Sequence, residues 1–114
     1  MVDLDFQDKF RHIINKIEET GNIYADKKSK SWYATELKGS ILASIIKSLP
    51  PMSVSQAELT AKASDDYKSY LAETRDNIKE ELEAKAQLEK WKSSFEALRS
   101  LSSLEKAQIN NESH

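Results

Sequence analysis

Few side chains in this sequence could do catalytic or metal-binding chemistry. Its only histidines are His12 and His114, and it contains no cysteine. His12 falls on the polar side of a predicted helix and His114 falls in a polar tail, so the two are not expected to form a catalytic or metal-binding pair. The sequence also contains no glycine-rich phosphate loop and no serine with an evident base partner. We therefore predict a protein that is not an enzyme and uses no cofactor or metal.

Acidic residues gather in two places, at Asp65 and Asp66 and again between residues 80 and 89. Carboxylates are metal ligands, but adjacent helical residues point in different directions, so a solvated face is the simpler interpretation. A sharper hypothesis is an acidic interaction face that presents fixed negative charge to a basic partner. Its candidate residues are Glu80, Glu81, Glu83 and Glu89.

Basic and aromatic residues alternate in the run KKSKSWY, from Lys27 to Tyr33. Lysines bind phosphates and aromatic rings stack on bases, so this run is a candidate nucleic-acid site. At helical spacing, however, aromatic residues more often pack in a core and lysines more often face water. DNA therefore remains a candidate ligand, and the candidate residues are Lys27, Lys28, Lys30 and Trp32.

The elements that would position these residues are helices. Two glycines and two prolines in 114 residues leave little material for turns, and 32% charged with 39% hydrophobic residues is typical of amphipathic helices. We predict an all-α fold, as an elongated antiparallel helical hairpin or three-helix arrangement, coiled-coil-like, with one long C-terminal helix in a single domain, 1–114. The predicted elements are helices at about 4–20 and 23–49, a turn at 50–55, a short helix at 56–63, a long helix at about 65–108 and a frayed tail at 109–114.

The boundaries follow from local chemistry. Gly21 and Asn22 both tolerate the left-handed conformation that ends helices, so a kink or short break is slightly favoured there. Pro50 and Pro51 stop a helix, and the chain then reverses. Ser53 and Ser55 each begin a pattern typical of a helix N-cap.

The long helix carries apolar residues in two sets when residues are placed at about 100° intervals. Leu71, Ile78 and Leu82 lie in one direction, and a later set lies in another, so the stripe changes face near residues 84–87. One interpretation is that each half packs on a different helix. The other is that the later set forms a partner or homodimer face, with Trp91, Phe95, Leu98 and Arg99 as its candidates.

No targeting segment is evident. The start, MVDLDFQDKF, is acidic and lacks the apolar region of a secretory signal, and the most apolar run, ILASII at residues 41–46, is too short to span a bilayer. A lack of cysteine is compatible with a reducing compartment. We expect a soluble, cytoplasmic protein with no membrane contact.

Three stretches carry a resemblance to known proteins. The segment YADKKSKSWYATELKGSILASIIKSL, followed by AELTAKASDDYKSYL and then by LEKWKSSFEALRSLSSLEKAQ, resembles small all-helical proteins of tailed phages and prophages found near recombination and replication genes. The likeness covers roughly residues 23–108, with Lys38, Ala63 to Tyr67 and Phe95 to Ser100 at the matching positions. It implies a non-enzymatic accessory protein in the cytoplasm of a bacterial host, whose partner is a phage recombinase or replication protein. The alternatives are an anti-host inhibitor of a bacterial nuclease, polymerase or defence complex, and a structural or assembly adaptor.

Overall fold

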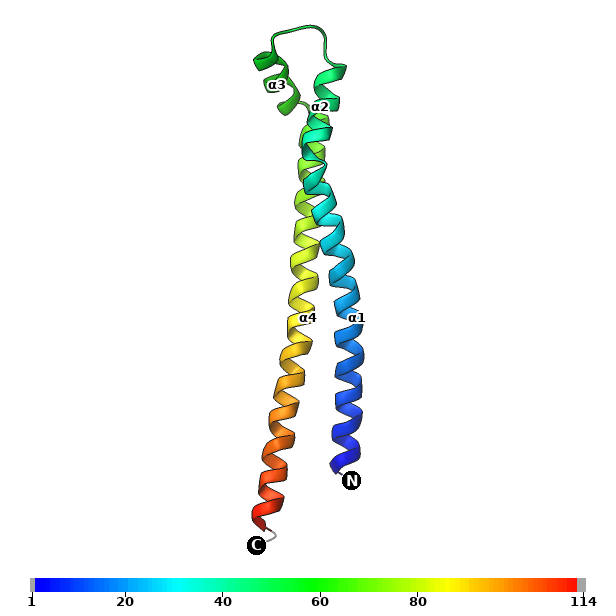
Figure 1. Cartoon of the computed structure of the whole chain (residues 1–114), viewed down its shortest axis with the longest axis vertical. Coiled ribbons are helices and arrows are strands. Elements are labelled where there is room, and N and C mark those ends of the chain that lie inside the picture. Colours follow the sequence, from blue (N-terminus) through cyan, green and yellow to red (C-terminus); the bar gives the residue numbers. More distant parts are fainter. Residues whose placement is uncertain (1, 113–114) are drawn as a thin grey trace. The chain divides into compact units, whose positions relative to one another are not determined.

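The computed structural model describes residues 2–112, all of whose secondary structure is helical (Figure 1). Its helices are α1 (Val2–Glu36), α2 (Lys38–Ser48), α3 (Val54–Lys62) and α4 (Asp65–Glu112). The all-α prediction with one long C-terminal helix is confirmed. His114 lies outside the described residues.

Helix α1 runs through Gly21 and Asn22 without a break, so the favoured kink is wrong. A glycine ends a helix by adopting a positive φ, and none of the described residues has one. The Thr20 hydroxyl instead donates to the carbonyl of Lys16 one turn earlier, at 2.6 Å. Gly21 lies inside the helix beside Leu88, although an interior helical glycine costs about 1 kcal/mol relative to alanine.

The interruption lies at Leu37, where the predicted helix 23–49 is divided between α1 and α2. Leu37 keeps a helical backbone, with φ −79° and ψ −7°. Its N–H donates to the carbonyl of Tyr33 at 3.0 Å, and its own carbonyl accepts from Ile41 N–H at 2.9 Å. Helical hydrogen bonding therefore continues on both sides of one irregular residue.

The connections after α2 follow the predicted turn chemistry. Leu49 is extended before Pro50 and Pro51, and the Ser53 hydroxyl accepts from the N–H of Gln56 at 3.3 Å to cap α3. The Ser64 hydroxyl likewise accepts from Tyr67 N–H at 3.2 Å, which caps α4. Helix α4 continues to Glu112 through a stretch that contains no glycine or proline, and fraying from residue 109 stays a prediction.

The chain divides into two compact units, which are described separately. Unit 1 contains the chain up to Tyr24 together with the chain from Glu83 onward, and unit 2 is Ala25–Leu82. The single domain predicted from the sequence stays a prediction.

Each unit contains an antiparallel helical pair. In unit 1, Phe10 packs on Phe95, whereas Gly21, further along α1, lies beside the earlier residue Leu88. In unit 2, Lys27 contacts Glu80 and Ala34 contacts Tyr70, and α2 packs against α3.

Unit 1 has an apolar seam between its helices. Ile13 of α1 is buried, as are Ala84, Leu88 and Leu98 of α4. Trp91 and Phe95 are half-buried between them, so the covered positions of α4 recur after alternately four and three residues. This seven-residue repeat is the pattern of a coiled-coil seam.

Unit 2 has a polar seam with the same repeat. Ser31 of α1 is 5% exposed. On α4, buried Tyr67 is followed at intervals of three and four residues by half-buried positions, which are Tyr70, Thr74, Asn77 and Glu81. Lys27 of α1 is half-buried as well. Polar side chains thus occupy positions that a coiled coil usually fills with apolar ones.

The prediction that Leu71, Ile78 and Leu82 form the covered face of α4 is wrong, because these side chains are 38%, 40% and 57% exposed. Tyr70, Thr74 and Asn77 follow the same repeat about 100° away around the helix, and this polar row is the one that is covered. The predicted change of face of the apolar residues near residues 84–87 holds, because those of unit 1 fill the seam. In unit 2 the apolar residues flank the seam.

Candidate interaction surfaces

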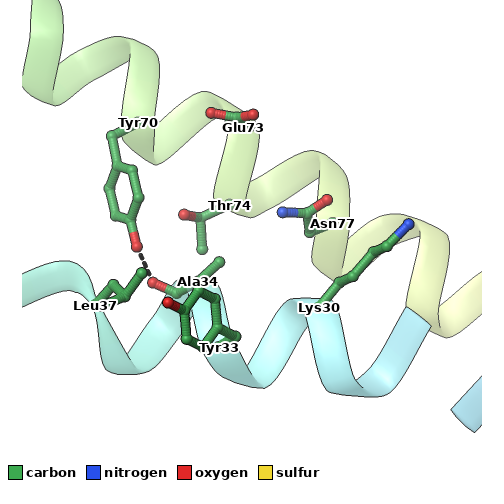
Figure 2. A pocket seen from close by; sticks show the side chains of 8 residues that line it. All are labelled: Lys30, Tyr33, Ala34, Leu37, Tyr70, Glu73, Thr74 and Asn77. Atoms are coloured by element: carbon green, nitrogen blue, oxygen red, sulfur yellow. Dashed lines mark hydrogen bonds between the residues drawn. The ribbon is translucent and has the colours of Figure 1, made fainter. Parts of the chain in front are cut away.

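A polar crevice of about 350 Å³ lies beside the seam of unit 2 (Figure 2). Residues 30–37 form one wall and α4 forms the other, and its lining is Lys30, Tyr33, Ala34, Leu37, Tyr70, Glu73, Thr74 and Asn77. The Tyr70 hydroxyl donates to the carbonyl of Ala34 across the crevice (Figure 2). This bond ties α4 to the last turn of α1, just before the irregular residue Leu37.

The hydroxyl of Thr74 in the same crevice is buried and finds no hydrogen-bond partner among the described residues. A buried hydroxyl without a partner costs about 1–3 kcal/mol. No group of three or more His, Cys, Asp or Glu side chains in the described part of the chain could hold a metal ion. The crevice therefore has hydrogen-bonding groups at its walls but no metal-binding set.

The lysines of the predicted nucleic-acid site are partly neutralised. Lys27 Nζ lies 3.1 Å from a Glu80 carboxylate oxygen, and Lys30 Nζ lies 3.5 Å from an Asp26 carboxylate oxygen. Lys28 is exposed. Trp32 is 64% exposed, so it is not a core residue and could stack on a ligand. The basic charge of this run is weaker than the sequence indicates, because Lys27 and Lys30 face carboxylates.

The acidic residues predicted to share one face have different surroundings. Glu80 pairs with Lys27, and Glu81 occupies a half-buried seam position. Glu89 pairs with Lys92 at 3.7 Å, and Glu83 is exposed. The seven-residue repeat turns Glu81 into the seam, and the antiparallel register places Lys27 against Glu80. The acidic interaction face stays a prediction.

The aromatic set of α4 is largely covered by α1 within unit 1. Phe95 meets Phe10 edge to face at 5.5 Å between ring centroids, and Trp91 meets the ring of His12 at 5.6 Å. Leu98 is 8% exposed, so it is not accessible to a partner of the folded chain. These contacts fit the interpretation in which the N-terminal helix covers this face. A partner role stays a prediction for the half-buried Trp91 and the exposed Arg99, which pairs with Glu96 at 3.6 Å.

An open groove of about 600 Å³ follows the same region of unit 1. Its lining is mostly apolar and comprises Asp8, Lys9, His12, Ile13, Trp91, Ser94, Ala97, Leu98 and Leu101. Leu101 is 57% exposed at its edge. The groove is where His12 and Trp91 reach the surface together.

A second row of side chains on α4, within unit 2, escaped the sequence interpretation. It consists of Lys68, Leu71, Arg75, Ile78 and Leu82, which recur after three, four, three and four residues, and we call it the α4 stripe. All five are exposed. The leucines and isoleucine were assigned to the core because they carry the strongest apolar signal in this part of the sequence. The signal that could have identified the stripe is the competing seven-residue repeat of Tyr67, Tyr70 and Thr74.

The fold and these surfaces define an all-α protein built from antiparallel helical pairs. Comparisons with protein-family models, with curated proteins and with solved structures find no match. Within the described residues, no helix combines the length and the apolar character that crossing a membrane requires.

Proposed function

We propose that this chain is a non-enzymatic phage or prophage accessory protein of DNA recombination or replication, and that it acts by binding a protein partner in the cytoplasm of a bacterial host. The observation that supports protein binding is the exposure of Leu71, Ile78 and Leu82 along one helix. Rows of exposed large apolar side chains mark interaction sites more often than scattered ones do. The phage setting is supported by the sequence resemblance over residues 23–108.

Direct DNA contact is the secondary part of this proposal. The exposed ring of Trp32 favours it, whereas the ion pairs of Lys27 and Lys30 weaken it. A gel shift with single-stranded DNA tests it, using charge reversal of Lys27, Lys28 and Lys30. We expect binding that falls steeply with salt and is lost in the reversed variant. A shift that survives both changes contradicts DNA contact by this run.

The protein-binding proposal is tested by affinity capture of the full chain from infected or lysogenic cells, followed by quantitative mass spectrometry. We expect a phage recombinase or replication protein to be enriched. Recovery of a host nuclease, polymerase or defence protein instead would contradict the accessory role and favour an anti-host inhibitor. Recovery of no protein above the level of an unrelated helical bait would contradict partner binding altogether.

A matched pair of variants shows which surface the partner uses. Leu71→Ser with Ile78→Ser changes the α4 stripe, and Leu59→Ser changes an exposed leucine of α3 that is 71% exposed. We expect the first variant to lose the partner and the second to retain it. Circular dichroism of both variants checks that the helices are intact.

A further inference from the structure

The α4 stripe combines apolar and basic side chains in one row. We propose that it is the docking site for an amphipathic α-helix of a partner protein that carries acidic residues beside its apolar ones. This inference rests on the proposed protein-binding function and specifies the partner's chemistry.

The apolar part of the stripe is arranged as a coiled-coil seam without a partner helix. Leu71 and Ile78 are seven residues apart and Leu82 follows four residues later, so their side chains project along one side of α4. The seam that α4 shares with α1 in unit 2 uses the same repeat one position earlier, at Tyr70 and Asn77. A helix laid along the stripe would therefore pack its apolar side chains between those of α4, as helices do in grooves and coiled coils.

The charged part of the stripe is basic. Lys68 and Arg75 stand in the same row as the apolar residues, and neither belongs to an ion pair among the described residues.

Three exposed aspartates of this part of α4, Asp65, Asp66 and Asp76, lie outside the α4 stripe, and its glutamates face other surroundings. Glu73 lines the polar crevice, Glu80 pairs with Lys27, and Glu81 is half-buried in the seam. The stripe thus presents positive charge beside apolar side chains. Carboxylates of a docking helix would be its complement, and an arginine can bind a carboxylate through two parallel hydrogen bonds.

The same charges disfavour a second copy of this chain as the occupant. A symmetric antiparallel pairing centred on the stripe would place Arg75 against Arg75 of the other copy. A parallel pairing in register would place Lys68 against Lys68. Both arrangements oppose like charges between apolar contacts. Nucleic acid is also a poor occupant, because phosphates would cover three apolar side chains and meet only two cations.

The probe for the experiment is a synthetic helical peptide of about three heptads, with Leu at its seam positions and Glu at the flanking positions. The matched control peptide carries Lys in place of each Glu. Fluorescence anisotropy with the full chain measures the affinity of both. We expect the acidic peptide to bind at least about tenfold more tightly, and the difference to shrink as salt is raised, because flanking charges are screened.

Variants of the chain assign the binding to the stripe. We expect Arg75→Glu to weaken the acidic peptide about tenfold and to strengthen the lysine peptide, because it reverses the local charge. Leu71→Ser with Ile78→Ser should weaken both peptides. The controls are Lys47→Glu, an exposed position on α2, and Leu59→Ser on α3. Both controls should bind as the unchanged chain does.

Several results would overturn the inference. These are failure of both peptides to bind, equal affinity for the two peptides, or equal weakening by Arg75→Glu and Lys47→Glu. A homodimer in sedimentation equilibrium that Leu71→Ser and Ile78→Ser dissociate would assign the stripe to a second copy. Single-stranded DNA binding that Arg75→Glu abolishes and the serine changes spare would assign it to nucleic acid.

The capture experiment separates this inference from the proposed function. A partner recovered equally by the unchanged chain and by the Leu71→Ser, Ile78→Ser variant would leave partner binding in place and overturn the role of the α4 stripe. A partner lost with this variant and retained with Arg75→Glu would overturn the acidic character of the docking helix alone.

Discussion

Units 1 and 2 are built on the same two long helices but hold them together by different means. In unit 1 the seam buries Ile13, Leu88 and Leu98, whereas in unit 2 it contains Ser31, Thr74 and Asn77. The seven-residue repeat of α4 is the same in both. The comparison teaches that the repeat decides which positions are covered, and that residue type decides how much each covered position stabilises the pair.

The consequence is that apolar residues are used differently in the two units. Burial of apolar surface contributes about 25 cal/mol per Å², so the seam of unit 1 should supply most of the interhelical stability. A hydrogen bond contributes only about 1 kcal/mol net. In unit 2 the large aliphatic residues of α4 lie outside the seam, where a partner can use them.

The largest expected effect on stability comes from truncating one apolar residue in each unit. Leu98→Ala in unit 1 should lower the free energy of unfolding by about 2–5 kcal/mol, because Leu98 is 8% exposed and its removal leaves a cavity. Leu82→Ala in unit 2 should change it by less than about 0.5 kcal/mol, because Leu82 is 57% exposed. Urea denaturation followed by circular dichroism measures both. Equal losses would show that the two seams do not differ in this way.

Removal of two hydroxyl groups of the polar seam should change the free energy of unfolding in opposite directions. Tyr70→Phe removes the hydrogen bond to the Ala34 carbonyl and should lower stability by about 1 kcal/mol. Thr74→Val removes a buried hydroxyl that has no partner among the described residues, and should raise stability by about 1 kcal/mol. Amide hydrogen exchange in residues 65–82 should become faster in Tyr70→Phe and slower in Thr74→Val. Destabilisation by Thr74→Val would mean that its hydroxyl is hydrogen-bonded in solution.

Gly21→Ala tests the continuity of α1 in unit 1. A Cβ atom at Gly21 would lie 3.9 Å from Cδ1 of Leu88, which is ordinary van der Waals contact. Alanine should therefore raise stability by about 0.5–1 kcal/mol, because glycine loses more backbone entropy in a helix. Gly39→Ala in α2 is the matched substitution, since nothing lies within 4 Å of its Cβ position. A loss of stability in Gly21→Ala but not in Gly39→Ala would indicate a break in the helix at Gly21.

The smallest effect concerns the ion pair of unit 2. Lys27→Met removes the contact with Glu80, which is 51% exposed, so stability should fall by no more than a few tenths of a kcal/mol. The loss should shrink further at about 1 M salt, where the Debye length is about 3 Å. A thermal melt at low and high salt measures it. A loss above about 1 kcal/mol that salt does not reduce would show that the pair is shielded from solvent.

Much of the secondary structure was accessible from the sequence because its causes are local. Pro50 and Pro51 cannot continue a helix, and Ser53 and Ser64 supply side-chain oxygens to the first free N–H groups of the next ones. The long C-terminal helix needs only a run without glycine or proline. Gly21 was misjudged because its helix-ending tendency is weak and tertiary packing overrode it.

The candidate site was much less accessible, because burial depends on the neighbouring helix. Leu71, Ile78 and Leu82 look like a core in the sequence, yet Tyr70, Thr74 and Asn77 occupy the seam beside them. The two rows face about 100° apart on α4, and only the position of the neighbouring helix decides which of them is covered.

The sequence by itself therefore determined an all-α chain with its capped ends and its one long helix, since propensity, capping and proline act within a few residues. Only the tertiary structure decided which face of that helix is covered, because the antiparallel register places Lys27 against Glu80 and Phe10 against Phe95. That choice leaves Leu71, Ile78 and Leu82 exposed in one row with Lys68 and Arg75.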